Sequence, residues 1–170
     1  MSESNRELLI TGLRNAYAVE SQALDMLKSQ HNRLDDYPEL KSRIGEHITE
    51  TEQQIVRLER CLGKFGESAS TLKDFALRAM GNLQNWMHAL ASDEVLKGTF
   101  ASYAFENYEI ASYTALIAMA EACGDAEVAD VCRQTLREEE AMADWLRQRI
   151  DPTVRQYMAK QRAEGSAGVK

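Results

Sequence analysis

The sequence predicts an all-α protein, a four-helix bundle with a long helical crossover between its second and third helices. Prolines and glycines are few, two and nine in 170 residues, so long segments run without a helix breaker. Within these segments apolar residues recur at steps of three and four, the spacing of a helix that buries one face. One stretch of about 30 residues between two such segments is far longer than a helical hairpin needs.

The first two helices are expected at residues 5–31 and 38–62. Between them Asp35 or Asp36 can cap a helix, and Pro38 suits the first turn of the second one. Gly63 is a typical residue just past a helix end. The apolar spacing that defines the first helix runs through Leu9, Leu13, Ala16, Ala23 and Leu27, and in the second helix through Ile44, Ile48, Ile55, Leu58 and Leu62.

Residues 64–93 are expected to form the crossover, with short helical pieces at 72–80 and 83–90. The third helix is expected to begin near residues 92–94, where Ser92-Asp93-Glu94 is a capping signal, and to end near Cys123. Gly124-Asp125 predicts a tight turn into a fourth helix over residues 126–150. Because Pro152 follows, we expect that helix to stop there. Residues 1–160 would then form one domain and residues 161–170 a disordered tail.

Six charged or imidazole side chains stand on or beside the apolar stripes of these helices, where hydrophobic residues are the default. They are Glu20 on the first helix, His47 and Glu50 on the second, Glu106 and Glu109 on the third, and Glu139 on the fourth. Each group lies about 12 to 18 residues from the turn of its hairpin, so the six side chains share one level of the bundle. Carboxylates that converge in an interior repel each other unless a cation balances them. The pattern therefore predicts metal ligands, and carboxylate with imidazole suits iron or manganese.

A short internal repeat in the sequence extends this prediction. Tyr17-Ala18-Val19-Glu20 resembles Tyr103-Ala104-Phe105-Glu106, and each segment belongs to the first helix of a hairpin. Two helix pairs joined by one long crossover are the arrangement of ferritin-like bundles. Five segments of the chain form a further set of motifs: Ala18-Val19-Glu20, Tyr37-Pro38-Glu39-Leu40, His47-Ile48-Thr49-Glu50-Thr51, Phe105-Glu106-Asn107-Tyr108-Glu109-Ile110-Ala111, and Glu138-Glu139 with Met142-Ala143-Asp144-Trp145-Leu146. In these motifs the chain resembles the YciE/YciF family of bacterial stress-associated proteins, and it is most similar to the YciE branch.

The resemblance implies a ferritin-like, rubrerythrin-like fold and a homodimer. The usual di-iron pattern has Glu-x-x-His on two helices, whereas this chain has His47-x-x-Glu50 on one helix and Met142 three residues after Glu139. Only one histidine is then available, so neither oxidase nor peroxidase activity follows directly from the resemblance. Matched by role, the helix carboxylates would be Glu20, Glu50, Glu106 and Glu139, with His47 and Glu109 as additional ligands.

Composition excludes several other function classes. There are 27 acidic and 20 basic residues, a net charge of −7, which argues against a nucleic-acid partner. No apolar run is long enough to span a membrane, and the N-terminus lacks the apolar segment of a signal peptide. Cys61, Cys123 and Cys132 are odd in number and lie inside helical patterns, as expected of unpaired thiols in the cytoplasm.

Three functional hypotheses remain open from the sequence. The first is a stress-associated protein with two iron or manganese ions that handles peroxide or dioxygen. The second is a non-enzymatic helical dimer or interaction module with a weak or vestigial metal site. The third, iron storage in a cage, ranks lowest because it requires assembly into a shell.

Overall fold

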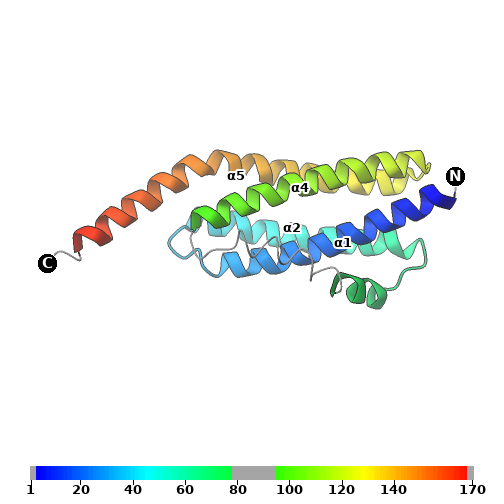
Figure 1. Ribbon diagram of the computed structural model, residues 1–170, viewed down its shortest axis with the longest axis horizontal. Coiled ribbons are helices and arrows are strands. Elements are labelled where there is room, and N and C mark those ends of the chain that lie inside the picture. The colour runs from blue at the N-terminus through cyan, green and yellow to red at the C-terminus, as the bar shows by residue number, and fades with distance from the viewer. Residues whose placement is uncertain (1–2, 78–94, 168–170) are drawn as a thin grey trace.

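The computed structural model describes residues 3–77 and 95–167, and these residues contain helices and turns but no strand. Helices α1 (Glu3–His31), α2 (Pro38–Gly63), α4 (Val95–Ala122) and α5 (Ala126–Ala167) run alongside one another (Figure 1). α1 packs against α2 and α4, and α5 packs against α4 and α2. The four helices therefore enclose a common interior, and the predicted all-α, bundle-like packing is confirmed.

Both tight turns lie where the sequence predicted them, but the expected cap at Asp35 or Asp36 is wrong. Tyr37 is the N-cap residue of α2, and among the described residues no side chain caps this helix end with a hydrogen bond. Before α2, the Tyr37 amide donates to the Leu34 carbonyl at 2.9 Å, and Pro38 takes the first helical turn, where its missing N–H costs nothing. Between α4 and α5, Gly124 adopts a φ of 70°, a left-handed conformation that glycine accepts without strain. Asp125 then caps α5 by accepting a hydrogen bond from the Val128 amide at 3.1 Å.

The crossover is described only in its first part. Residues 69–77 are helical, and Leu72 and Ala76 within them are buried against the bundle. The remainder of the expected pieces, from residue 78 onward, and the expected start of the third helix at residues 92–94 lie outside the described residues.

The prediction that the last helix stops at Pro152 is wrong. Helix α5 continues to Ala167 with Pro152 inside it, so residues 161–167, where we expected a disordered tail, are helical. A proline inside a helix removes one hydrogen bond and crowds the preceding turn, and contacts made by residues beyond Pro152 help to compensate for that cost. Gln156 donates to the Asp36 carbonyl at 2.9 Å, and Lys160 pairs with the Asp36 carboxylate. These bonds attach the extension, which reaches past the other helices in Figure 1, to the α1–α2 turn.

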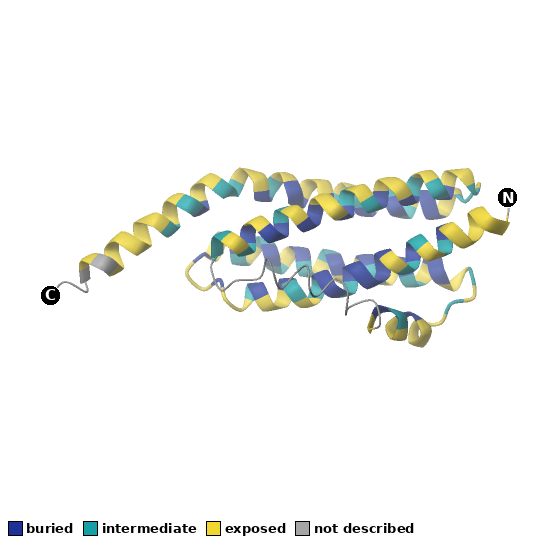
Figure 2. Ribbon diagram, in the orientation of Figure 1, coloured by how far each residue is buried: buried dark blue, intermediate teal, exposed yellow. Residues whose placement is uncertain are grey.

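The buried residues face inward along all four helices (Figure 2) and form two main apolar clusters. The larger one, here called the first cluster, contains the ends of α1 and α2 near Leu9, Leu13, Leu58 and Leu62 together with the α4–α5 turn. The second cluster lies at the opposite end, around Leu27, Ile44, Met142 and Leu146. The interior between them contains buried polar residues together with a small apolar cluster of Val19, Ala23 and Phe105. No helix in the described part of the chain is both long and apolar enough to cross a membrane.

Candidate metal centre

Five of the six predicted site residues are almost completely buried in the layer between the two apolar clusters. The exposed fraction is 1% for Glu20, His47 and Glu106, 2% for Glu109 and 0% for Glu139. They come from all four helices: α1, α2, α4 twice and α5. Burial of this many acidic groups is costly unless each finds a partner or a counter-ion.

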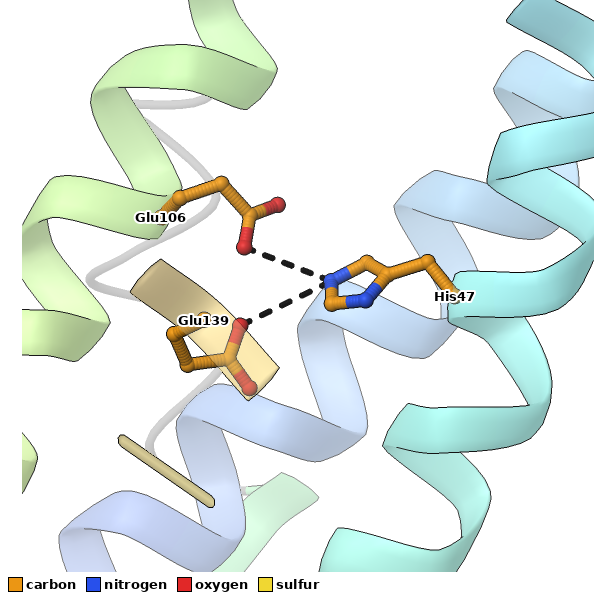
Figure 3. A group of neighbouring side chains, drawn as sticks. All are labelled: His47, Glu106 and Glu139. Atoms are coloured by element: carbon orange, nitrogen blue, oxygen red, sulfur yellow. Dashed lines mark ion pairs between the residues drawn. The ribbon is translucent and has the colours of Figure 1, made fainter. Parts of the chain in front are cut away.

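His47, Glu106 and Glu139 form the tightest group. One ligand atom from each lies within 4.8 Å of the other two, and all three residues are buried. In Figure 3 the imidazole points from α2 toward the two carboxylates of α4 and α5, and one ring nitrogen faces both. His47 Nε2 is 3.3 Å from Glu106 Oε2 and 3.6 Å from Glu139 Oε2. The three residues that the sequence placed at one level therefore converge on one point.

These separations suit a shared cation. Nitrogen and oxygen ligands about 2.1 Å from an ion, at angles of 90–109°, lie about 3.0–3.4 Å from each other. In addition, Glu106 Oε2, Glu109 Oε1 and Glu139 Oε2 are buried and have no hydrogen-bond partner. Native interiors rarely leave such oxygens unpartnered without an ion or a water. The donor set present thus fits a metal ion, and the buried His47, Glu106 and Glu139 group could bind one.

Glu20 and Glu109 adjoin this group. Tyr113 of α4 donates from its hydroxyl to Glu20 Oε1 at 2.5 Å. Burial raises the pKa of Glu20 to about 7, although the bond from Tyr113 acts in the opposite direction. Burial also raises the pKa of Glu109 well above its ordinary value, and the charges of Glu20 and Glu106 raise it further. Without a cation, this layer would take up protons.

The pKa of His47 reflects its acidic surroundings. Burial by itself would lower this pKa, but the charge of the nearby Glu106 and the hydrogen bond to Glu50 outweigh that effect and raise the pKa to about 9. The pKa of Glu139 is raised well above its ordinary value, first by burial and then by the charges of Glu109, Glu20 and Glu106. A metal ion that binds here must therefore displace protons.

Glu50, the sixth predicted residue, lies at the edge of the layer. Its side chain is 35% exposed, and its Oε2 lies 2.8 Å from His47 Nδ1 and 3.1 Å from Arg43 Nη1. The hydrogen bond from His47 is the main cause that lowers the pKa of Glu50. Glu50 is therefore a salt-bridged carboxylate beside His47, unlike the four interior ones.

Sequence reasoning missed a set of polar side-chain contacts between α2 and α5. Gln54 is fully buried and donates from Nε2 to Glu139 Oε1 and, at 3.0 Å, to Glu138 Oε2. Arg57 pairs with the same Glu138. Although Glu138 stands beside the apolar stripe of α5, its carboxylate is held by Arg57 and Gln54, and its side chain is only 23% exposed. The available signal was Gln54 itself, a polar residue in the stripe between Thr51 and Leu58.

Other acidic residues of α2 and α5 are mostly exposed. Glu46 and Glu52 have exposed side chains, and Glu140 is also exposed. Glu59 differs, since it is partly buried and accepts a hydrogen bond from the Tyr17 hydroxyl at 3.2 Å. His31 is partly buried in the turn region, and His88 lies outside the described residues.

Comparison with known proteins identifies the family. The model of a domain family of unknown function, DUF892, matches residues 4–159. The chain belongs to the DUF892 family. The crystal structure of a protein from Xanthomonas campestris pv. campestris is similar to this chain at 36% sequence identity and a TM-score of 0.78, over 93% of this chain and 99% of the other. The predicted resemblance to the YciE/YciF group is confirmed at the level of this family.

Two further solved structures are similar. YcfI of Rhodopseudomonas palustris, described as a candidate structural protein, is 27% identical with a TM-score of 0.65, over 86% of this chain and 97% of its own. The stress protein YciF of Escherichia coli is 24% identical with a TM-score of 0.74, over 91% of this chain and 99% of its own. The match to YciF establishes a shared fold.

Proposed function

We propose that this DUF892 member is a ferritin-like metalloprotein that holds two iron or manganese ions between its four helices. One observation carries the proposal: His47 Nε2 and the unpartnered oxygens of Glu106 and Glu139 converge within 4.8 Å in a buried layer. The pairing of α1 with α2 and α4, and of α5 with α4 and α2, supports the ferritin-like arrangement. A carboxylate-rich interior of this kind is where such bundles build their metal sites.

The residues present divide naturally between two ions. His47, Glu106 and Glu139 would hold the first ion, and Glu20 and Glu109 extend the donor set toward a second one. Burial is the main cause that raises the pKa of Glu109, and the charges of Glu20 and Glu106 raise it further. This supports a short separation between the three carboxylates. The hydroxyl of Tyr113 orients Glu20. Imidazole with several carboxylates is a donor set for iron or manganese rather than for soft metals.

Bound iron or manganese would supply electrons to peroxide or dioxygen, the chemistry that we propose for this protein under stress. The role in stress is supported by the shared fold with YciF, which is described as a stress protein. The chain's own contribution is to exclude water, since both apolar clusters close off the layer. Carboxylates that have lost their protons then bind the cations in a medium of low dielectric constant.

The test is a titration of the full chain with Mn²⁺ or anaerobic Fe²⁺, followed by metal analysis after gel filtration. Wild type is expected to retain up to two ions per chain. Glu106→Gln with Glu139→Gln keeps the side-chain volumes but removes two charged ligands, and it should lose at least about 100-fold in affinity. Glu140→Gln, a change at an exposed neighbour, is the matched control and should bind as wild type does. Equal and negligible metal in all three proteins would refute the proposal.

A second candidate is a non-enzymatic helical module whose metal site is weak or vestigial. It is favoured by the protein groups that already occupy ligand oxygens, Gln54 on Glu139 and Tyr113 on Glu20. The single histidine of the layer supports it as well. Under this reading, exhaustive chelation leaves the melting temperature unchanged, and restored metal consumes no peroxide. Turnover above a metal-only blank would eliminate it.

In both candidates we propose that the chain works as a homodimer in the cytoplasm. The unpaired state of Cys61, Cys123 and Cys132 is consistent with a reducing compartment. The outer face of α4 is the proposed contact, because Glu106 and Glu109 are the charged residues from 98 to 120 and both are buried. Phe100 and Tyr108 on that face are 46% and 48% exposed. Interfaces favour such aromatic residues and avoid charge.

Light scattering on the purified chain tests the dimer. Wild type should have twice the mass of one chain, and Tyr108→Arg should shift it toward the monomer because a charge would enter the contact. Met158→Arg changes an exposed apolar residue on a different helix, α5, and is the control that should keep the mass of wild type. A monomeric wild type would rule out the dimer.

A further inference from the structure

The two ring nitrogens of His47 meet different kinds of partner. Nδ1 lies 2.8 Å from Glu50 Oε2, an ordinary hydrogen-bond length. Nε2 lies 3.3 and 3.6 Å from Glu106 Oε2 and Glu139 Oε2, and neither oxygen has a hydrogen-bond partner. One side of the ring is thus closed by a short bond, while the other faces a space bounded by acceptors.

Helix geometry explains why the ring is turned this way. His47 and Glu50 are three residues apart on α2, so their side chains are neighbours on one face. The Glu50 carboxylate, one helical turn ahead, accepts a hydrogen bond from Nδ1. Nε2 then points across the bundle toward α4 and α5 (Figure 3). Arg43, also on α2, donates to the same Glu50 oxygen, Oε2, at 3.1 Å.

The charges of the layer support a separate role for Glu50. The Glu50 carboxylate is paired with Arg43, so it does not need a metal ion for its compensation. Without it, the interior carboxylates are Glu20, Glu106, Glu109 and Glu139, which together carry four negative charges when ionised. Two divalent cations would balance those four charges, and buried sites are stable only when they are close to neutral.

We propose that Glu50 is a positioning residue and not a metal ligand: held by Arg43, it keeps the proton of neutral His47 on Nδ1 and leaves the Nε2 lone pair for the cation. Metal-ligating histidines commonly donate their other ring N–H to a carboxylate, which fixes the tautomer and the ring orientation. This inference rests on the proposed function and changes the predicted ligand set of that same site.

The test uses Zn²⁺ as a redox-silent, diamagnetic probe, with affinity measured by competition against a chromophoric chelator. Glu50→Ala removes the acceptor for Nδ1–H, and we expect about a 10- to 100-fold loss of affinity with the number of ions per chain unchanged. Glu50→Gln keeps an amide oxygen in the same place, so affinity should recover to within about tenfold of wild type. Glu46→Gln changes the other carboxylate near Arg43, which is exposed and 4.0 Å from Arg43 Nη1, and should match wild type.

A second readout is independent of affinity. In zinc-loaded protein labelled with ¹⁵N-histidine, the His47 signals should report metal on Nε2 and hydrogen on Nδ1 in wild type and in Glu50→Gln. In Glu50→Ala the two tautomers should mix. Circular dichroism confirms that each variant is folded before these comparisons are made.

Three results would overturn the assignment, and they are distinguishable. Wild-type affinity in Glu50→Ala would mean that Glu50 has no role in the site. A loss in Glu50→Gln as large as in Glu50→Ala, with fewer ions per chain, would make Glu50 a ligand. A wild-type chain that binds no zinc, manganese or iron would refute the proposed function itself, and the assignment would fail with it.

Discussion

The polar middle layer and the apolar clusters on either side of it are built from the same four helices but are stabilised in opposite ways. The clusters around Leu13 and Leu27 contain closely packed hydrophobic side chains. The layer between them buries Glu20, Glu106 and Glu139 at about 1% exposure or less. Burial stabilises the fold in the clusters and destabilises the ionised carboxylates in the layer.

This difference indicates how stability and function are separated along the bundle. The clusters pack the helices through apolar contacts that include no residue of the proposed metal site. In the layer, the metal-free protein has buried carboxylate oxygens without hydrogen-bond partners, on Glu106, Glu109 and Glu139, and their burial costs free energy. Changes in a cluster should therefore affect folding alone, and changes in the layer should affect metal binding first.

The largest effect is expected in the first cluster. Leu13 is fully buried, so Leu13→Ala should lower the free energy of unfolding by about 2.7–5 kcal/mol through lost burial and a cavity. Manganese affinity of the folded fraction should not change. Denaturant unfolding measures the first quantity and equilibrium dialysis the second. Leu8→Ala, at a residue 55% exposed, is the control and should fall within about 0.5 kcal/mol of wild type.

Metal binding should stabilise the layer to a similar extent. At free Mn²⁺ concentrations of 100 to 1,000 times Kd, mass action adds about 2.7–4.1 kcal/mol to the free energy of unfolding. Calorimetric scans with and without chelator measure the shift. The variant with Glu106→Gln and Glu139→Gln should show no shift. If it shifts as much as wild type, the metal that stabilises the protein is bound elsewhere.

A buried carboxylate of the layer should be replaceable with a gain in stability. Glu109→Leu, in the absence of metal, should raise the free energy of unfolding by about 1–4 kcal/mol because it removes a buried acid whose Oε1 has no partner. The same change should weaken metal binding. Glu138→Leu is the opposing control, since Glu138 is paired with Arg57 and its loss should destabilise the protein. Destabilisation by both changes would contradict the contrast between layer and clusters.

The smallest expected effect is the dependence of the metal-free protein's stability on pH. Burial raises the pKa of Glu20 from 4.5 to about 7, so the folded state binds more protons than the unfolded state in that range and stability falls as pH rises through it. Burial by itself lowers the pKa of His47, but the charge of Glu106 helps to raise that pKa from 6.5 to about 9. That stabilisation is complete below pH 6.5 and is lost as pH rises through about 9.

Thermal melts of chelated protein between pH 5 and 9 check this expectation. The melting temperature should fall as pH rises, and saturating Mn²⁺ should remove most of the fall because metal binding displaces the same protons. A metal-free melting temperature that rises across this range would contradict the electrostatic account of the layer.

The sequence was sufficient to predict the helices and the level of the site because both follow from local spacing. Antiparallel helices rise equally from their turn, which places Glu20 near His47 and Glu106 near Glu139 along the bundle. It was not sufficient for contacts that depend on how helices rotate against each other. Gln54 meets Glu139 across 85 positions of sequence, and Tyr113 meets Glu20 across 93. No local pattern encodes such pairings.

The same reason explains the error at Pro152. Local propensity ends a helix at proline, but the continuation depends on bonds from Gln156 and Lys160 to Asp36, which lies in another turn of the chain. It also explains Glu50, whose spacing from His47 was predicted but whose attachment to Arg43 was not.

The most direct test of the central claim is anomalous scattering from a crystal of this chain grown with Mn²⁺, measured on both sides of the manganese absorption edge. The account predicts an anomalous peak within bonding distance of His47 Nε2 and the carboxylates of Glu106 and Glu139, with a second peak toward Glu20 and Glu109. Ordered side chains in this layer without any anomalous peak, at a Mn²⁺ concentration far above that needed by known manganese sites, would contradict it.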